Sequence, residues 1–547
     1  MAGLFRILLQ EVTIRVPDTS AAPTRTRCSD FSACRMACDT HRKSLAVSRS
    51  TVNNSCRLRN CCERVDLSVM SYNTIYEPGQ PSTHRIIGTL VGQAVGDALG
   101  ATYEFGPAGA FSKTFPHNGD IEMRGGGSFG WEVGEFTDDT QMAVILAQSI
   151  VERDEFDPSD VFARWRKWAR TARDVGSTTR RALSQNSLHE ARDVISDGRG
   201  NGTGAVMRVS PVGLMRGTDT YVEWVARTQG KITHPDNRTV ESGVIAALLI
   251  KRLVRASMTP NPTEIYWMVH EIIGEHVELG MREWAYEQFG DKQTYWGNNF
   301  EGHHCLTQAL HSVASTDNYI DAVRTAIDMG GDADTVAAVT GAIAGAMYGI
   351  TGIPARLTTK VHGYVPGVAS VQHIRLEDLY ALASNVSGRG WRRRSPDYGG
   401  VVKPVRLWNH GGVEIYASNL AGAATVDPNE FGVISLCRTF GELDHIPDRV
   451  QFYLVDDAKP ESNPNLAEVV EDIKAEIFKM MLRKKKILIH CHAGVSRTGF
   501  VAKLIHMELF WSTHEEAHAE LTAVYPRYQM TNQAFTDYLS REFFATP

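Results

Sequence analysis

The sequence predicts a multidomain protein in which an all-α region is followed by a smaller α/β region. Apolar residues recur at helical spacing through the first part of the chain, alternating strand patterns are scarce before residue 385, and a Gly-, Arg- and Pro-rich stretch follows. At 547 residues the chain also exceeds what one hydrophobic core usually holds. We therefore expect an extension at 1–83, a helical domain at 84–387, a linker at 388–402 and an α/β domain at 403–547.

The N-terminal extension differs from the rest of the chain in composition. Residues 1–69 contain six of the nine cysteines and carry 11 Lys and Arg against 6 Asp and Glu, whereas the whole chain has a formal charge of −6. The cysteine spacing matches no standard zinc motif, so we expect disorder here. Because Met70 precedes a conventional-looking protein start, an upstream misread of the gene is an alternative origin for the extension.

The composition outside the extension narrows the class of protein. Hydrophobic residues make up 43% of the chain and charged residues 22%, which is typical of a globular protein. No run of 18 apolar residues could cross a bilayer, and Arg6 and Glu11 interrupt any signal-peptide core, so we expect a cytoplasmic protein without a membrane partner. The negative net charge makes nucleic acid an unexpected partner.

The individual elements follow from periodicity. Apolar residues from Ile86 to Ala98 have helical spacing, and the same period returns at 140–152, 240–255 and 335–348. In the C-terminal part, short strand patterns at 413–416, 432–436, 452–455 and 487–489 alternate with helical patterns at 465–482 and 499–509. This alternation predicts a small α/β domain.

Two acidic clusters dominate the helical region. They are Thr137–Thr140 (TDDT) and Asp332–Thr335 (DADT), and each opens a predicted helix. One such cluster alone is typical of a helix N-cap. Two clusters brought together would hold four carboxylates that repel each other unless divalent cations lay among them. Oxygen ligands without His or Cys select magnesium or manganese, so the sequence predicts a dinuclear site for hard metal ions.

The strongest signal in the C-terminal region is the segment Ile487–Gly499. An apolar strand ends in a loop in which Cys491 and Arg497 stand six positions apart, and a helix follows. The amides of such a loop can surround one oxyanion while the guanidinium binds two of its oxygens. The same positive field would favour a nucleophilic thiolate. We expect these residues to bind phosphate: His492, Ala493, Gly494, Val495 and Ser496, with Thr498 donating its hydroxyl to the sulfur of Cys491.

Further motifs of the helical region support a family resemblance. Gly96–Glu104, Gly200–Arg208 and Thr233-His234, together with the two acidic clusters, closely resemble the ADP-ribosylglycohydrolase family over about residues 84–384. The resemblance implies an orthogonal helical bundle, two Mg²⁺ ions with Mn²⁺ as the alternative, and removal of ADP-ribose from a modified protein or a small-molecule conjugate.

The resemblance also implies roles for single residues. The metal ligands would be Thr137, Asp138, Asp139, Asp332, Asp334 and Thr335. Glu104 would act beside the scissile bond as a catalytic carboxylate, and Asp97 would support the site from behind it. Gly202, Thr203, Gly204 and His234 would bind the substrate. The family has asparagine where this chain has Thr203, unless the loop shifts to use Asn201.

The loop from Cys491 to Thr498 resembles that of the protein tyrosine phosphatase superfamily, and the domain is similar in size to the dual-specificity branch, over about residues 403–545. The resemblance implies a phosphorylated substrate, a phosphocysteine intermediate and an aspartate that protonates the leaving oxygen. Asp457 stands where the family places this acid, with Asp456 as the alternative. His490 would support the loop by hydrogen bonding.

The sequence therefore predicts a bifunctional hydrolase with an ADP-ribosylglycohydrolase site and a phosphatase site. A protein that binds ADP-ribose or phosphate without turnover is one alternative. A glycohydrolase fused to an RNA or nucleotide phosphatase is another. The motifs do not distinguish arginine, serine, nucleobase or small-molecule conjugates as the ADP-ribose acceptor.

Overall fold

The computed structural model describes residues 79–195, 200–290, 298–366, 372–390, 400–525, 527–528 and 532–542. The expected N-terminal extension lies outside the described residues up to residue 78, and so does most of the expected linker. None of the described helices has the length and apolarity that crossing a membrane requires.

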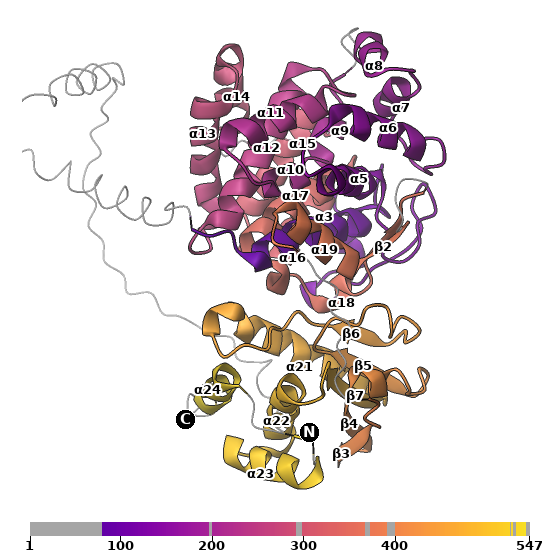
Figure 1. The fold of residues 1–547 in the computed structure, drawn as a ribbon, viewed down its shortest axis with the longest axis vertical. Helices are drawn as coiled ribbons and strands as arrows, with labels where there is room; N and C mark the ends of the chain where they lie inside the picture. Colours follow the sequence, from indigo (N-terminus) through magenta and orange to yellow (C-terminus); the bar gives the residue numbers. More distant parts are fainter. Residues whose placement is uncertain are drawn as a thin grey trace, which may run out of the picture. The chain divides into compact units, whose positions relative to one another are not determined.

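The region before residue 391 is helical, and the four helices expected there are confirmed (Figure 1). The helices are α3 (Thr83–Gly100), α4 (Ala110–Thr114), α5 (Asp138–Arg153), α6 (Pro158–Trp168), α7 (Ser177–Leu183), α8 (Leu188–Val194), α9 (Gly204–Met207), α10 (Ser210–Leu214), α11 (Asp219–Gly230), α12 (Asn237–Arg255), α13 (Ile265–His276), α14 (Arg282–Phe289), α15 (Gly302–Ala314), α16 (Tyr319–Ile327), α17 (Ala333–Tyr348), α18 (Ala355–Thr358) and α19 (Leu376–Val386). Two short strands, β1 (His362–Tyr364) and β2 (His373–Arg375), form an antiparallel pair.

The centre of this region is the pair of helices α3 and α17, which pack with their backbones in contact. Every fourth residue of α3 from Gly88 to Gly100 is glycine. A Cβ atom at any of these four positions would lie 2.1 to 2.5 Å from an atom of α17, most often a backbone carbonyl oxygen. Only glycine permits this approach. The contact brings the C-terminal end of α3, with Asp97, beside the first turn of α17.

The C-terminal region is a separate α/β structure. Its strands are β3 (Val405–His410), β4 (Val413–Asn419), β5 (Phe431–Ser435), β6 (Arg449–Gln451) and β7 (Lys486–Cys491), in the sheet order β3-β4-β7-β5-β6. Strand β3 is antiparallel to β4, while the other neighbours are parallel. The helices are α20 (Leu420–Ala423), α21 (Leu466–Leu482), α22 (Ser496–Phe510), α23 (His514–Val524) and α24 (Gln533–Glu542).

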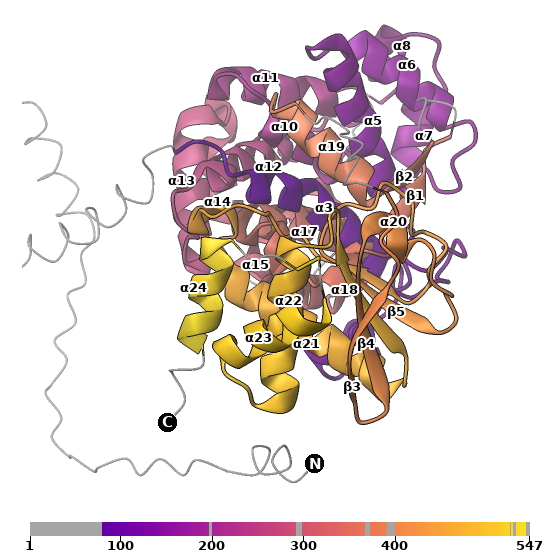
Figure 2. The same ribbon diagram turned by 60° about the horizontal axis from the view of Figure 1, so that its bottom comes forward.

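The sheet has a different apolar layer on each face. Along β7, Ile487 and Ile489 belong to the core that includes α21, α22 and α23, whereas Leu488 points to a smaller core formed with α20. Figure 2 shows α21 and α22 on one side of the sheet and α20 on the other. Strand β7 is the central strand of the sheet and is covered by an apolar layer on each face, so its carboxyl end is held from both faces.

One expected strand is wrong. The residues from Phe452 to Val455 follow the edge strand β6 but form no strand themselves. Their side chains alternate between buried and partly exposed, which reproduces the period of a strand without its backbone pairing. Strand β3 was not expected.

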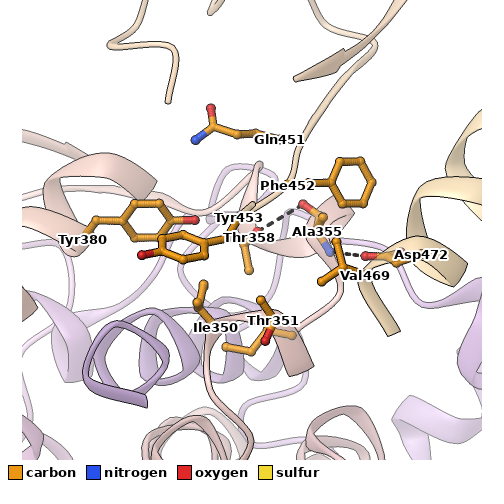
Figure 3. A pocket seen from close by; sticks show the side chains of 11 residues that line it. Ile350, Thr351, Ala355, Thr358, Tyr380, Gln451, Phe452, Tyr453, Val469 and Asp472 are labelled. Carbon is orange, nitrogen blue, oxygen red and sulfur yellow. Dashed lines mark hydrogen bonds between the residues drawn. The ribbon is translucent and has the colours of Figure 1, made fainter. Parts of the chain in front are cut away.

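The helical region and the α/β region contact each other around Tyr453. Its ring lies edge to face with Tyr380, with ring centroids 5.6 Å apart, and with His84, at 4.9 Å. Figure 3 shows the two tyrosine rings side by side in a small cavity, with the backbone N–H of Ala355 donating to the carboxylate of Asp472 at 2.8 Å. Segments that precede the loop of Cys491 in the sequence therefore rest on the helical region.

Candidate active sites

The first site lies where α5 and α17 begin. Thr137 caps α5 by accepting a hydrogen bond from the backbone N–H of Asp139, and Asp332 occupies the N-cap position of α17. The hydroxyl groups of Thr137 and Thr335 both donate to Oδ2 of Asp139, at 3.1 and 3.3 Å. Two helix starts that are 196 residues apart in sequence thus meet at one carboxylate.

Five acidic side chains crowd together at this point. Carboxylate oxygens of Asp97, Asp139 and Asp334 lie within 4.8 Å of one another, and so do those of Glu104, Asp332 and Asp334. The structure therefore brings the two predicted acidic clusters together and adds Asp97, which lies in α3, and Glu104, which follows that helix. Asp138 borders the same group, since its pKa is raised by burial first and then by nearby carboxylates.

The electrostatics of this group call for cations. Burial, followed by the charges of neighbouring carboxylates, raises the pKa of Glu104 to about 8, and burial raises that of Asp332 to about 6. The pKa values of Asp139 and Asp334 lie well above the usual range for the same two reasons. Glu104 Oε2 and Asp139 Oδ1 are buried without a hydrogen-bond partner in the described part of the chain. Buried carboxylate oxygens with unused lone pairs fit hard divalent ions.

Asp97 has a supporting position. Its two oxygens accept hydrogen bonds from the backbone N–H groups of Thr137 and Thr140, at 2.9 and 3.0 Å. Burial raises its pKa to about 6, and these hydrogen bonds oppose the shift. Asp97 therefore holds the first turn of α5 in place and lies beneath the pocket, not in its wall.

A pocket of about 400 Å³ opens above the acidic group. The predicted site residues in its wall are Glu104, Asp138, Asn201, Gly202, Thr203, Gly204, His234, Asp332, Asp334 and Thr335. Thr137 and Asp139 lie beneath it, buried. The substrate loop and the metal-binding group therefore share one cavity.

Asp174 also lines this pocket and was missed from the sequence. It forms a hydrogen bond with Asp138, and its negative charge raises the pKa of Glu104 and Asp332. It stands in the segment Arg173-Asp-Val-Gly176, where nothing marks it apart from other surface aspartates. Phe300, which stacks on Phe105 at a centroid distance of 5.9 Å, is a second wall residue without a sequence signal.

The departure at Thr203 has a structural consequence. The side chain of Thr203 hydrogen-bonds to Asp332, so the loop is tied directly to the acidic group. The loop itself is held by Asn201, whose carbonyl oxygen accepts hydrogen bonds from the hydroxyl of Thr239 and the N–H of Gly302, both at 2.9 Å. Thr203, and not Asn201, therefore supplies the loop's side-chain contact with the acidic group.

The second site lies at the carboxyl end of β7, where the loop from Cys491 leads into α22. Cys491 is buried at the floor of this loop. Gly494 has a φ of +70°, and a Cβ atom there would lie 2.5 Å from the carbonyl oxygen of Ser418, so both conformation and space require glycine. Thr498 is buried, and its hydroxyl has no hydrogen-bond partner among the described residues, so the expected donation to the sulfur of Cys491 is not formed.

The carbonyl groups of this loop are bound from outside. That of His492 accepts from the N–H of Leu420 at 3.3 Å, that of Ala493 from Nε of Arg527 at 3.0 Å, and that of Gly494 from the hydroxyl of Tyr525 at 2.8 Å. Since carbonyl and N–H groups of a peptide point in opposite directions, outward carbonyls turn the loop's N–H groups toward its centre. This arrangement suits an oxyanion.

The side chains around the loop are placed as follows. Arg497 donates through one terminal nitrogen to the carbonyl oxygens of Leu436 and Leu454, at 2.9 and 3.1 Å. Ring nitrogen Nε2 of His490 lies 2.7 Å from the hydroxyl of Ser435, and burial lowers the pKa of His490 to about 3. A neutral His490 thus ties β7 to β5 just before the loop.

The two candidate acids differ in position. Asp456 accepts a hydrogen bond from the hydroxyl of Ser496 at 2.7 Å, and its other oxygen lies 3.7 Å from Nε of Arg497. Asp457 is turned toward Ser462 and the N–H of Lys459, which lower its pKa. Asp456, which the sequence analysis gave as the alternative, therefore lies beside the loop, whereas the favoured Asp457 is turned away from it.

The helical region holds a group of buried carboxylates that could bind metal ions beneath a pocket, and comparison with known proteins identifies its family. The family model for ADP-ribosylglycohydrolase matches residues 79–394. The chain belongs to the ADP-ribosylglycohydrolase family. This membership supports ADP-ribosyl hydrolase activity.

Among its relatives, the chain is 30% identical over 291 residues to the ADP-ribosyl-(dinitrogen reductase) glycohydrolase of Rhodospirillum rubrum, a match that covers 51% of this chain and 92% of the relative. It is 31% identical over 289 residues to an ADP-ribosylarginine hydrolase of Serratia proteamaculans, covering 51% and 75%.

Two solved structures are similar to the chain over part of its length. An ADP-ribosylglycohydrolase-related protein complex covers 56% of this chain and 99% of its own, at 30% identity and a TM-score of 0.47. The Cydia pomonella PTP-2 phosphatase covers 25% and 88%, at 22% identity and a TM-score of 0.22.

Proposed function

We propose that the chain is a bifunctional hydrolase that releases ADP-ribose from a modified acceptor at the first site and hydrolyses a phosphate monoester at the second. The observation that carries the first activity is the group of buried carboxylates beneath a pocket whose wall includes Glu104. Relatives are named for ADP-ribosylated dinitrogen reductase and ADP-ribosylarginine, so an ADP-ribosylated protein is the expected substrate class.

The residues of the first site fit two magnesium ions. The oxygen ligands would come from Thr137, Asp138, Asp139, Asp332, Asp334 and Thr335. When bound, such ions orient ribose hydroxyl groups and lower the pKa of nearby water. Glu104 lines the pocket, so its carboxyl group can transfer a proton to the leaving group or take one from water. Asp174, on the same wall, is the second candidate for this proton transfer.

Incubation of the full chain with arginine-linked and serine-linked ADP-ribosyl peptides tests this activity. We expect magnesium-dependent release of ADP-ribose from one of them, a loss of at least 100-fold in the Glu104→Gln variant, and a similar loss in Asp332→Asn. Tight ADP-ribose binding by the wild-type chain without release from any conjugate would instead identify a binding protein.

The phosphatase half rests on the loop of Cys491. Its carbonyls are bound from outside, Arg497 stands at its end, and an aspartate contacts it through Ser496. Cys491 would attack phosphorus, and its sulfur would then form a phosphocysteine while the leaving oxygen takes a proton from Asp456. This placement favours Asp456 over Asp457 as the acid.

Hydrolysis of an aryl phosphate by the full chain tests the second activity. Cys491→Ser should abolish it, because the serine hydroxyl ionises far less readily than a thiol. Chelation of magnesium should leave it unchanged, since the loop itself binds the oxyanion. Turnover by Cys491→Ser at the wild-type rate would exclude the cysteine as nucleophile. A preference for RNA 5′-phosphates over aryl phosphates would favour a nucleotide phosphatase.

A further inference from the structure

His234 lies against the substrate loop of the first site. Its ring lies close to the glycines of that loop: a Cβ atom at Gly204 would lie 2.3 Å from Cε1, and one at Gly202 would lie 3.3 Å from Nε2. His234 contributes to the pocket wall although it is only 3% exposed. Its Nε2 atom has no hydrogen-bond partner among the residues that the structure describes, whereas Nδ1 has one.

The partner of Nδ1 determines where the imidazole carries its proton. The hydroxyl oxygen of Thr233 lies 2.8 Å from Nδ1 of His234 and 2.7 Å from a terminal nitrogen of Arg208. A guanidinium can only donate, so the Thr233 oxygen accepts from Arg208. The Thr233 hydroxyl has no other acceptor among the described residues, so its single proton is directed to Nδ1, because an Nδ1–H would leave that buried proton unpaired. Since Nδ1 then accepts, the neutral ring carries its proton on Nε2.

Arg208 is held so that this direction is fixed. Its side chain is fully buried, and its Cζ atom lies 4.0 Å from the ring centroid of Trp165. It donates from Nε to Oε1 of Gln229 at 2.9 Å and from a terminal nitrogen to the carbonyl oxygen of Gln229 at 3.0 Å. The amide of Gln229 is oriented in turn, because it donates to the carbonyl oxygen of Ala205 at 2.8 Å. The Arg208 donor is therefore fixed on the Thr233 oxygen, and the opposite tautomer of His234 would leave the Thr233 hydroxyl proton buried without an acceptor among the described residues.

The same surroundings keep the imidazole uncharged. Burial, and then the positive charge of Arg208, lower the pKa of His234 to about 3. The ring is therefore neutral at physiological pH, and its only donor is the N–H at Nε2.

We propose that Arg208 and Thr233 are positioning residues that hold His234 as the Nε2–H tautomer, so that it donates a hydrogen bond to an acceptor oxygen of bound ADP-ribose. This inference rests on the proposed function, which places ADP-ribose in the pocket. Arg208 and Thr233 act through His234 and do not touch the ligand.

Calorimetric titration of ADP-ribose into the full chain with magnesium tests the role of Thr233. We expect Thr233→Val to weaken binding at least fivefold, because the hydroxyl that directs the tautomer is gone while the volume is kept. Thr233→Ser should bind within twofold of wild type. Thr89→Val is the matched control, since Thr89 is also buried and donates to a backbone carbonyl within α3, at 2.8 Å. Its affinity should not change, whatever it does to the melting temperature.

Two variants of His234 test the tautomer itself. The amide nitrogen of glutamine can reach the position of Nε2, and that of asparagine the position of Nδ1. We expect His234→Gln to retain more affinity than His234→Asn by at least threefold.

Three results would count against these ideas in different ways. Wild-type affinity in Thr233→Val would overturn the inference, and so would binding by His234→Asn that equals or exceeds that of His234→Gln. The absence of any ADP-ribose binding by the wild-type chain would instead overturn the proposed function. If Thr233→Val does not fold, the comparison of the two His234 variants decides.

Discussion

The acidic group predicts how magnesium binding depends on pH. Burial raises the pKa of Asp332 from 3.8 to about 6. The folded protein therefore binds more protons at this group than the unfolded chain between about pH 4 and pH 6. The stability that the protonated carboxyl contributes is fully present below the unfolded pKa and is lost as the pH rises through the folded pKa. A cation that replaces this proton should therefore bind more tightly at higher pH.

The magnitude follows from the same value. At pH 5, one unit below a pKa of about 6, a cation must displace the proton of Asp332 at a cost of about 1.4 kcal/mol, which is about tenfold in the dissociation constant. At pH 7 the cost has almost disappeared. The pKa values of Asp139 and Asp334 are also raised, so about tenfold weaker binding at pH 5 than at pH 7 is a lower bound.

Calorimetric titration of magnesium into the chelator-stripped full chain at pH 5, 6 and 7 measures this directly. Melting temperatures should be compared only as differences with and without magnesium, because the buried imidazole of His234 changes the stability with pH in the opposite direction to Asp332. The lowered pKa of His234 gives stability that is lost as the pH falls. Asp332→Asn should weaken binding and reduce its pH dependence. Equal dissociation constants at pH 5 and pH 7, or tighter binding at pH 5, would refute the reasoning.

Three further predictions concern single contacts. Gly204→Ala should weaken ADP-ribose binding at least tenfold, because its Cβ atom would lie 2.3 Å from an imidazole carbon, whereas Gly119→Ala, with open space around it, should bind as wild type. Asp456→Asn should lower kcat for an aryl phosphate more than Asp457→Asn does; the reverse order would restore Asp457 as the acid. Glu377→Ala removes the acceptor of the backbone N–H groups of Thr439 and Phe440. It should lower the free energy of unfolding, measured by urea titration, by about 1–3 kcal/mol. An unchanged free energy of unfolding would show that water replaces this acceptor.

The sequence predicted the helices better than the strands for a physical reason. The apolar period of α3 or α17 arises from burial within one continuous element, so it is visible locally. Strand β6 has only three residues, too few to show an alternating pattern, although its partner β5 lies only 16 residues earlier in the chain. In the segment that follows, Phe452 and Leu454 enter the core of the α/β region while Tyr453 points to the helical region, and this alternation imitates a strand. Strand β3 lies at the sheet edge, where half-exposed positions blur the alternation.

The candidate sites were predictable to the extent that they repeat a local pattern. Each acidic cluster opens a helix and is visible locally, whereas their convergence followed from the family resemblance, because carboxylates without cations repel each other. Asp174 is a single residue in a loop and has no such signal. The choice between Asp456 and Asp457 depends on which side chain is directed toward Ser496, and the spacing of adjacent residues cannot resolve this. The glycines at every fourth position of α3 were visible in the sequence and do indicate the close contact with α17.

The contact between the two regions has a consequence for any test of the C-terminal activity. Glu377 of α19 accepts hydrogen bonds from the backbone N–H groups of Thr439 and Phe440, and Phe440 stacks on His492 of the loop. Tyr453, which precedes the acid Asp456 by three residues, is packed against the helical region. A fragment that begins at residue 400 would expose that ring and leave those N–H groups without their acceptor. An inactive fragment would therefore say little about the chemistry of Cys491, whereas an inactive full chain with intact folding would count directly against it.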